Sequence, residues 1–178
     1  MSSHMRMNEV IVAFQYFLVD ARPDCCEIYQ SEPVEASVNL DAINEWGSVV
    51  ALTYIGAQRV FPDYNDMADA KAMLESVARN FGYHYGVRKK VRINTISQSP
   101  TPTTAGAGVK GFDDFIAFAD AMSPLGNARA EDCANYCVSL FSDLTKFVTM
   151  QNLFHDGGFS STGMSESAMA KMNNIKYP

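Results

Sequence analysis

The chain has 178 residues, of which 47% are hydrophobic and 19% are charged, and its formal net charge is −6. This length and composition suit one folded domain with a hydrophobic core and argue against disorder. The acidic balance argues against broad nucleic-acid binding, which needs a basic face, and the apolar run at residues 10–19 is too short to cross a membrane.

The first forty residues carry no chemistry that we can assign. Residues 1–5, MSSHM, look like the remnant of an expression vector and are left out of the fold reasoning. Residues 10–19 are rich in β-branched and aromatic side chains, which favours a strand over a helix. Residues 1–40 therefore stay unassigned, and we expect the main domain over residues 41–178.

A strand, a helix and a second strand come next. Residues 48–53, SVVALT, form the continuous apolar run of a parallel strand that is buried on both faces. Between residues 65 and 81 the hydrophobic residues recur at helical spacing, and Gly82 is the expected residue just beyond the helix end. Residues 91–97, VRINTIS, predict the second strand. The three elements make a crossover unit, which is normally right-handed.

The second half of the chain predicts three helices and one strand. A turn-rich loop at residues 98–111 precedes a short helix at 112–122. The clearest helical pattern covers residues 130–144, with Cys133, Cys137, Leu140, Phe141 and Leu144 on one face. A third strand is expected at 150–154, and a short helix near residues 167–172.

The four cysteines do not form a metal signature. Cys25 and Cys26 are adjacent, whereas Cys133 and Cys137 are four residues apart on a predicted helix and so share its buried face. Neither pair has the C-x-x-C spacing of a metal or redox motif. We therefore expect reduced, structural thiols in a cytosolic protein, and no metal site.

Two further motifs indicate structure rather than chemistry. Gly106, Gly108 and Gly111 match the G-x-G-x-x-G spacing of a dinucleotide fingerprint. That fingerprint needs a strand directly before it and a helix opening at its glycines. Here a Pro- and Thr-rich loop precedes the glycines, which favours a flexible loop. Similarly, His155 and Asp156 have no third ligand nearby, so they indicate a turn at a strand end.

The loop after residues 91–97 carries three short hydroxyl side chains, Thr101, Thr103 and Thr104. Ligands of open α/β sheets bind beyond the carboxyl ends of the strands. These hydroxyls suit phosphate or amide groups of such a ligand. A polar loop that binds nothing remains an equal alternative.

Tyr64 and Lys71 are seven residues apart, so about two helical turns place them on the same face. A lysine beside a phenol favours the phenolate and lowers the pKa of the tyrosine. The pair would then provide a proton donor of usable strength near neutral pH. Because such a pair also arises by chance, its neighbours in the sequence decide its meaning.

Six segments between residues 41 and 163 match one family in order and spacing. They are Thr53-Tyr54-Ile55-Gly56, Pro62-Asp63-Tyr64-Asn65 with Lys71, Asn94-Thr95-Ile96-Ser97 with Pro100 and Thr103, Met122-Ser123-Pro124-Leu125, Phe141-Ser142-Asp143-Leu144 and His155-Asp156-Gly157-Gly158-Phe159. With these segments, the chain resembles the C-terminal half of NADH-dependent enoyl-acyl-carrier-protein reductases, which are divergent short-chain dehydrogenases/reductases. The trio of Tyr54, Tyr64 and Lys71 resembles the enoyl reductases in particular, since related ketoreductases have a serine in place of Tyr54.

The resemblance implies an α/β fold, namely a partial doubly wound, Rossmann-like parallel sheet that lacks the N-terminal dinucleotide-binding strands. Nothing in residues 1–40 resembles those strands. The strand at residues 48–53 would then have an inner edge without its family neighbour, and open strand edges are pairing hazards. Two hypotheses follow: residues 10–19 add a strand at this edge, or two chains dimerise across it.

The resemblance also implies roles for the site residues. Tyr64 would hydrogen-bond the thioester oxygen of a trans-2-enoyl substrate, which gains negative charge when a hydride from NADH reaches the β-carbon. Lys71 would hold the nicotinamide ribose and support Tyr64, and Tyr54 would line the acyl site. Thr101 and Thr103 would bind the cofactor.

Phe112 would contact the substrate, at the end of a mobile loop that starts at Thr104 and covers the acyl chain. The resemblance implies a cytoplasmic enzyme of fatty-acid biosynthesis that acts on enoyl groups linked to acyl-carrier protein. It also implies a homo-oligomer, since full-length relatives are tetramers, and neither a nucleic-acid nor a membrane partner. We expect impaired activity, because half of the cofactor seat has no counterpart. The alternatives are a non-catalytic structural or assembly remnant and another short-chain reductase, which Tyr54 disfavours.

Overall fold

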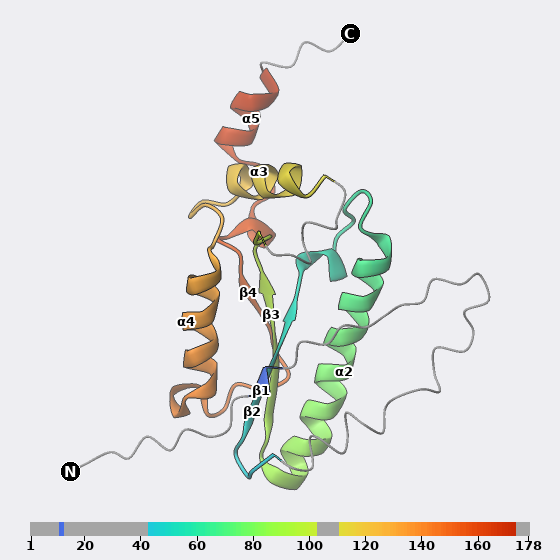
Figure 1. Ribbon diagram of the computed structural model, residues 1–178, viewed down its shortest axis with the longest axis vertical. Helices are drawn as coiled ribbons and strands as arrows, with labels where there is room; N and C mark the ends of the chain where they lie inside the picture. Colours follow the sequence, from blue (N-terminus) through green and yellow to red (C-terminus); the bar gives the residue numbers. More distant parts are fainter. Residues whose placement is uncertain (1–10, 13–42, 103–110, 174–178) are drawn as a thin grey trace, which may run out of the picture.

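The structure is a computed structural model that describes residues 11–12, 43–102 and 111–173. Its centre is a parallel four-stranded sheet in the order β1-β2-β3-β4, with helices on both faces (Figure 1). The strands are β1 (Ile11–Val12), β2 (Ser48–Thr53), β3 (Arg92–Gln98) and β4 (Asn152–His155). The expected α/β fold with a partial, Rossmann-like parallel sheet is confirmed.

The inner edge of β2 is paired in part by the N-terminal segment. Ile11 lies beside Val49 and Val12 beside Val50, in parallel. The structure describes two residues of the segment 10–19, and for these two the pairing agrees with the hypothesis that the segment adds a strand at this edge. Dimerisation across the same edge stays a prediction.

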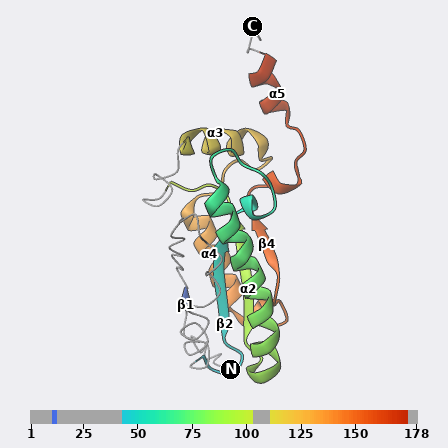
Figure 2. The same ribbon diagram turned by 90° about the vertical axis from the view of Figure 1, so that its right-hand side faces the viewer.

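Helix α2 (Asn65–Lys89) is longer than expected and covers one face of the sheet (Figures 1 and 2). The prediction that it ends before Gly82 is wrong. It continues for about two more turns and ends at Lys90, which takes a left-handed backbone conformation with φ 57°. Gly82 is buried inside the helix, and a Cβ atom there would lie 2.6 Å from Met150 Cγ. The glycine therefore serves close packing rather than a helix end.

The core is divided into two layers by the sheet. On the α2 side, the buried side chains are Ile43, Val49, Ala78, Tyr85, Val91 and Ile93. On the other side, helix α4 (Ala130–Phe141) packs Cys133 and Leu140 against Val50 and Ile96. Val49 and Val50 are successive residues of β2 and face opposite layers, so both faces of this strand are covered, as its apolar run predicts.

Helix α4 ends earlier than its pattern predicts. Leu144, expected on the buried face of this helix, lies in the 3-10 helix η3 (Asp143–Thr145) and is 91% exposed. The buried Arg92 side chain explains this turn, because it donates hydrogen bonds to the Ser142 carbonyl at 3.3 Å and to the Thr145 carbonyl at 2.9 Å. A guanidinium that needs these acceptors favours a turn over continued helix.

The remaining elements lie at and beyond the carboxyl ends of the strands (Figure 2). They are the 3-10 helix η1 (Ile55–Ala57), α3 (Phe112–Met122), the 3-10 helix η4 (Phe159–Ser161) and α5 (Glu166–Asn173). The predicted helix at 112–122 and the tail helix are confirmed, and β3 and β4 are each shifted by one or two residues. No helix in the described part of the chain is long and apolar enough to cross a bilayer.

Two glycines of α2 offer a matched test of close packing. A Cβ at Gly86 would meet only the Val91 carbonyl, at 3.7 Å, whereas one at Gly82 would collide with Met150. Since alanine favours a helix over glycine, Gly86→Ala should raise the free energy of unfolding by about 1 kcal/mol. Gly82→Ala should lower it by about 1–2 kcal/mol through overpacking. Urea unfolding measures both, and equal effects would contradict the packing role of Gly82.

Candidate active site

Tyr54 and Tyr64, two of the predicted site residues, lie together at the carboxyl end of β2. Tyr54 directly follows β2, and Tyr64 directly precedes α2. The two rings are in edge-to-face contact, with centroids 5.4 Å apart and planes at 76°. Tyr54 also contacts Phe61, at 5.2 Å between centroids. The two tyrosines are therefore neighbours, joined by the short segment that contains η1.

This ring contact depends on Gly56 in η1. A Cβ atom there would lie 2.8 Å from two atoms of the Tyr64 ring and 3.1 Å from Tyr54 Cδ1. Any larger residue would push the two rings apart. Sequence reasoning assigned Gly56 no role, because the requirement exists only once the chain has turned back on itself.

Lys71 lies two turns after Tyr64 on α2 and is half-buried. Its Nζ donates a hydrogen bond to the carbonyl of Leu52, near the end of β2, at 2.8 Å. Burial lowers the pKa of this ammonium. The lysine thus lies at the strand end that carries Tyr54, on the same helix that starts after Tyr64.

The expectation that Lys71 lowers the pKa of Tyr64 is wrong. Burial raises the pKa of the Tyr64 phenol. The pKa of Tyr54 is raised as well, mainly by burial and further by the negative charge that Tyr64 and Asp156 would place near it. Each ring contacts other aromatic side chains, which keep water away from the phenols, and this desolvation disfavours their charged form. At neutral pH both phenols therefore keep their protons and can donate hydrogen bonds.

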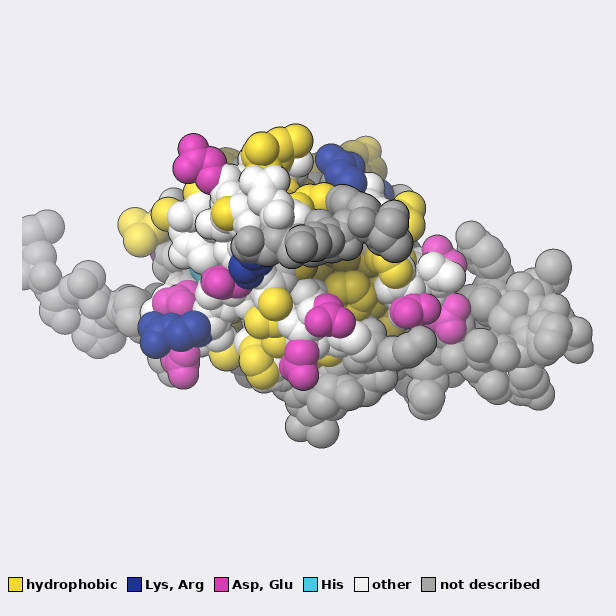
Figure 3. Space-filling model, turned by 90° about the horizontal axis from the view of Figure 1, so that it is seen from above, with side chains coloured by type: hydrophobic (Ala, Val, Ile, Leu, Met, Phe, Trp, Pro, Cys, Tyr) yellow, Lys and Arg dark blue, Asp and Glu magenta, His cyan; other side chains and the backbone are white. Residues whose placement is uncertain are grey.

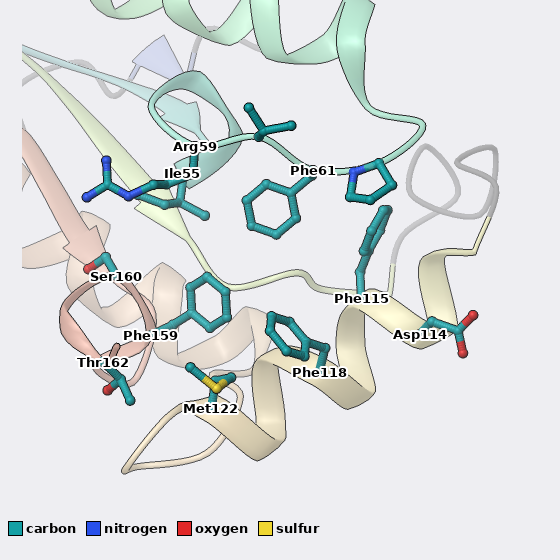
Figure 4. Close-up of a pocket in the computed structure, with 12 residues that line it drawn as sticks. Ile55, Arg59, Phe61, Asp114, Phe115, Phe118, Met122, Phe159, Ser160 and Thr162 are labelled. Atoms are coloured by element: carbon teal, nitrogen blue, oxygen red, sulfur yellow. The ribbon is translucent and has the colours of Figure 1, made fainter. Parts of the chain in front are cut away.

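A pocket of about 520 Å³ opens beside the tyrosines, between η1, α3 and η4 (Figure 4). Three ring contacts build its wall: Phe61 with Phe115 and with Phe159, and Phe118 with Phe159, at 5.9 to 6.2 Å between centroids. Figure 3 looks onto this end of the molecule, where hydrophobic side chains surround a hollow with acidic side chains around it. The pocket suits an apolar ligand.

Sequence reasoning missed most of this pocket. Phe112, the expected substrate contact, is the first residue of α3 and does not line it, whereas Phe115 and Phe118 do. Phe115 was predicted as part of the helix at residues 112–122, with no role in the site. Phe159 ends one of the family segments but was given no role, and Phe118 carried no signal, because the wall is assembled from segments far apart in the sequence.

The turn after β4 fixes the backbone around Phe159, one of the residues that line the pocket. Asp156 is buried, and its carboxylate accepts hydrogen bonds from the backbone N–H groups of Gly158 and Ser160, both at 3.0 Å. These bonds fix the backbone on both sides of Phe159. The preceding His155 has its Nδ1 2.8 Å from Gln98 Oε1. The structure agrees with a strand-end turn, and no group of metal-binding side chains occurs among the described residues.

The threonine loop is described only in part. The Thr101 hydroxyl donates to the Ser99 carbonyl at 3.0 Å, so it is engaged within its own turn. Thr103, Thr104 and the first two glycines of the glycine motif lie outside the described residues. The third, Gly111, precedes α3 with φ 73°, a conformation that favours glycine.

The two described cysteines lie where the helical pattern placed them. Cys133 is buried and Cys137 half-buried on the same face of α4, and both are free thiols. A hydrogen bond between them lowers the pKa of Cys137 to about 7 and raises that of Cys133. Cys25 and Cys26 lie outside the described residues.

Comparison with known proteins gives consistent matches. The family model described as enoyl-(acyl carrier protein) reductase matches residues 34–160. The NADH-dependent enoyl-acyl-carrier-protein reductase FabI of Escherichia coli (strain K12) is 36% identical over 70% of this chain and 47% of its own length. FabI of Buchnera aphidicola is 37% identical over 70% of this chain and 48% of its own.

Solved structures of enoyl-acyl-carrier-protein reductases match the chain as well. The FabI–NADH complex from Alistipes finegoldii is 64% identical, with a TM-score of 0.74 over 80% of this chain and 50% of that one. The Plasmodium berghei enoyl-acyl-carrier-protein reductase with triclosan is 32% identical, with a TM-score of 0.68 over 71% of this chain and 45% of that one. The chain spans about half the length of the relatives that it matches.

The raised pKa of Tyr54 predicts a pH-dependent stability. The phenol has an ordinary pKa of 10.0 in the unfolded chain and a higher one when folded. Its contribution to stability is therefore complete below about pH 10 and is lost as the pH rises toward the folded-state pKa. Urea unfolding at about pH 8 and about pH 11 measures this loss. From the lower to the higher pH, the free energy of unfolding should decrease more in the unmodified chain than in Tyr54→Phe. Equal losses would contradict the burial of this phenol.

Proposed function

Because this chain belongs to the enoyl-(acyl carrier protein) reductase family, we propose that its residues 41–178 form the C-terminal catalytic half of an NADH-dependent enoyl-acyl-carrier-protein reductase of fatty-acid biosynthesis. One observation carries the proposal: two mutually contacting phenols lie next to an apolar pocket, at the carboxyl end of the parallel strand whose backbone binds the half-buried Lys71. Ligands of open α/β sheets bind at this place.

The residues present fit a nicotinamide cofactor. Among the described residues, the Leu52 carbonyl is the one acceptor of Lys71, so two of its three N–H donors are available there for ribose hydroxyls. The Tyr64 phenol makes no hydrogen bond with the described residues. When bound, NADH supplies the hydride for the β-carbon of the enoyl thioester. Thr101 lies at the end of β3 on the same edge, where we place the cofactor together with Thr103, which lies outside the described residues.

Tyr64 has the protonation state that this reaction needs. Hydride addition to the β-carbon sends negative charge to the thioester oxygen, and a donor aimed at that oxygen stabilises the transition state. Since burial raises the pKa of Tyr64, the phenol is neutral at working pH and has a proton to share. Lys71 holds the ribose and adds positive charge to the site. Tyr54 does not line the pocket itself; because its ring contacts Tyr64 and the pocket residue Phe61, we place it where the acyl site meets the reacting oxygen.

The pocket fits the acyl part of the substrate. Its volume of about 520 Å³ and its aromatic wall suit an apolar chain. Phe61 contacts both Tyr54 and the pocket wall, so it joins the reacting end of the site to the acyl end. Phe112 does not line this pocket, and only its position at the start of α3, which forms one side of the pocket, supports its place near the substrate.

The substrate in this proposal is an enoyl thioester on acyl-carrier protein, and the enzyme acts in the cytoplasm as a homo-oligomer. The other candidate, a structural or assembly remnant without catalysis, is not favoured by the comparisons, because the relatives are named as NADH-dependent reductases.

An NADH titration separates the two candidates. If this chain binds the nicotinamide as proposed, it should bind NADH in the micromolar range, which fluorescence or calorimetry detects. Lys71→Ala should weaken binding about tenfold or more, because the ribose loses a charged donor. An absence of binding at millimolar NADH would leave the remnant as the better candidate.

Tyr64→Phe tests the chemical role assigned to the phenol. The variant should lower kcat for reduction of a trans-2-enoyl thioester by about 10²- to 10³-fold, as expected for the loss of one donor to a developing oxyanion. NADH binding should stay close to that of the unmodified chain. Tyr83→Phe, on the exposed side of α2, is the matched control and should leave kcat unchanged. Full turnover by Tyr64→Phe would refute the role.

A further inference from the structure

Glu75 of α2 is a buried carboxylate that the chemistry above does not use. Its residue is 5% exposed, and in the described part of the chain its side chain meets no cation. Instead it accepts hydrogen bonds from three neutral side chains. The donors are Thr53 Oγ1 at 3.0 Å and Asn152 Nδ2 at 3.1 Å, both to Oε1, and Gln58 Nε2 at 3.1 Å, to Oε2.

Two of these donors stand on either side of the segment that carries Tyr54. Thr53 is the last residue of β2, and Gln58 follows η1 directly. One carboxylate group therefore ties both ends of the segment Tyr54–Ala57 to the middle of α2. The segment includes Gly56, on which the Tyr64 ring packs.

The next turn of α2 holds the same strand end. Lys71, four residues before Glu75, donates to the Leu52 carbonyl at 2.8 Å. Lys71 and Glu75 thus bind the successive residues Leu52 and Thr53 from neighbouring turns of one helix. Asn152 lies on β4, the strand on the far side of β3 from β2, so the network reaches across three strands. Its Oδ1 also accepts a hydrogen bond from Thr95 Oγ1 of β3, at 3.1 Å.

Burial of a charge without a cation opposes folding unless hydrogen bonds replace its hydration. An ionised carboxylate offers acceptors on both oxygens and no donor, which matches three converging N–H and O–H groups. An apolar side chain at this position would leave those three donors without an acceptor. The arrangement is therefore specific for a carboxylate and fixes the geometry of what it binds.

We propose that Glu75 is a positioning residue that sets the Tyr54 ring against Tyr64 by binding both ends of the segment Tyr54–Ala57. This proposal rests on the proposed function where it concerns catalysis, because Tyr54 then lines the acyl site. The placement of the ring itself is independent of turnover and can be measured separately.

Fluorine NMR of the chain labelled with 3-fluorotyrosine measures ring placement. The Tyr54 and Tyr64 resonances are the ones that disappear in Tyr54→Phe and Tyr64→Phe. Glu75→Ala should shift both of them toward the position of free fluorotyrosine and leave Tyr136, on α4, unchanged. Asp69→Asn, which removes an exposed carboxylate from the same helix, should shift none of them. Unmoved Tyr54 and Tyr64 resonances in folded Glu75→Ala would overturn the proposal.

A milder variant covers the case in which Glu75→Ala does not fold. Gln58→Ala removes one of the three donors from an exposed position and leaves the carboxylate in place. It should shift the Tyr54 resonance in the same direction by a smaller amount. An unchanged Tyr54 resonance in Gln58→Ala, with Glu75→Ala unfolded, would assign Glu75 to general stability and overturn the positioning role.

Measurements of kcat and of NADH affinity distinguish the positioning role of Glu75 from the proposed reaction itself. In a chain that reduces enoyl thioesters, Glu75→Gln and Gln58→Ala should lower kcat by about tenfold through misplacement of the site, while the affinity for NADH stays the same. A decrease in NADH affinity with unchanged kcat would contradict positioning of Tyr54. A chain without turnover would refute the proposed reaction, and the fluorine resonances would still decide the role of Glu75.

Discussion

The parallel pairing of β2 with β3 decides where every candidate site residue lies. Their register runs from Ser48 beside Arg92 to Thr53 beside Ser97, so the two strands end at the same level. Tyr54 leaves one strand end, and the segment with Thr101 leaves the next. The crossover helix α2 starts near this end of β2 and runs antiparallel to both strands, so Tyr64 and Lys71, at its start, lie near the same strand ends (Figure 1). The site is thus a consequence of the strand pairing.

Buried ionisable groups fix the turns around this sheet. Glu75 binds the segment after β2, Arg92 binds the turn after α4, and Asp156 binds the turn after β4. In the described part of the chain, each of them is held by neutral hydrogen-bond partners, and Arg92 also interacts with the charge of Asp143. Such groups add little net stability, but each one specifies a single backbone path. Two of these three turns, those held by Glu75 and Asp156, carry aromatic side chains of the site or its pocket.

Errors in the sequence-based predictions have one common origin, namely contacts between distant segments. Gly82 carried the signal of a helix end but is a close-packing site against Met150. Leu144 continued a helical stripe but is turned outward, since Arg92 captures the carbonyls beyond α4. The pKa of Tyr64 was expected to fall through Lys71, yet burial among other rings raises it. No local pattern contains these partners.

The sequence by itself determined the strands, the crossover, the family and the identities of Tyr54, Tyr64 and Lys71, because apolar runs, helical spacing and family motifs are local properties of the chain. Only the tertiary structure decided the ring contact between the tyrosines, their raised pKa values, the pocket wall of Phe61, Phe115, Phe118 and Phe159, and the convergence of three donors on Glu75. These features depend on distances and desolvation among residues from separate segments, which are set only when the sheet and its helices pack together.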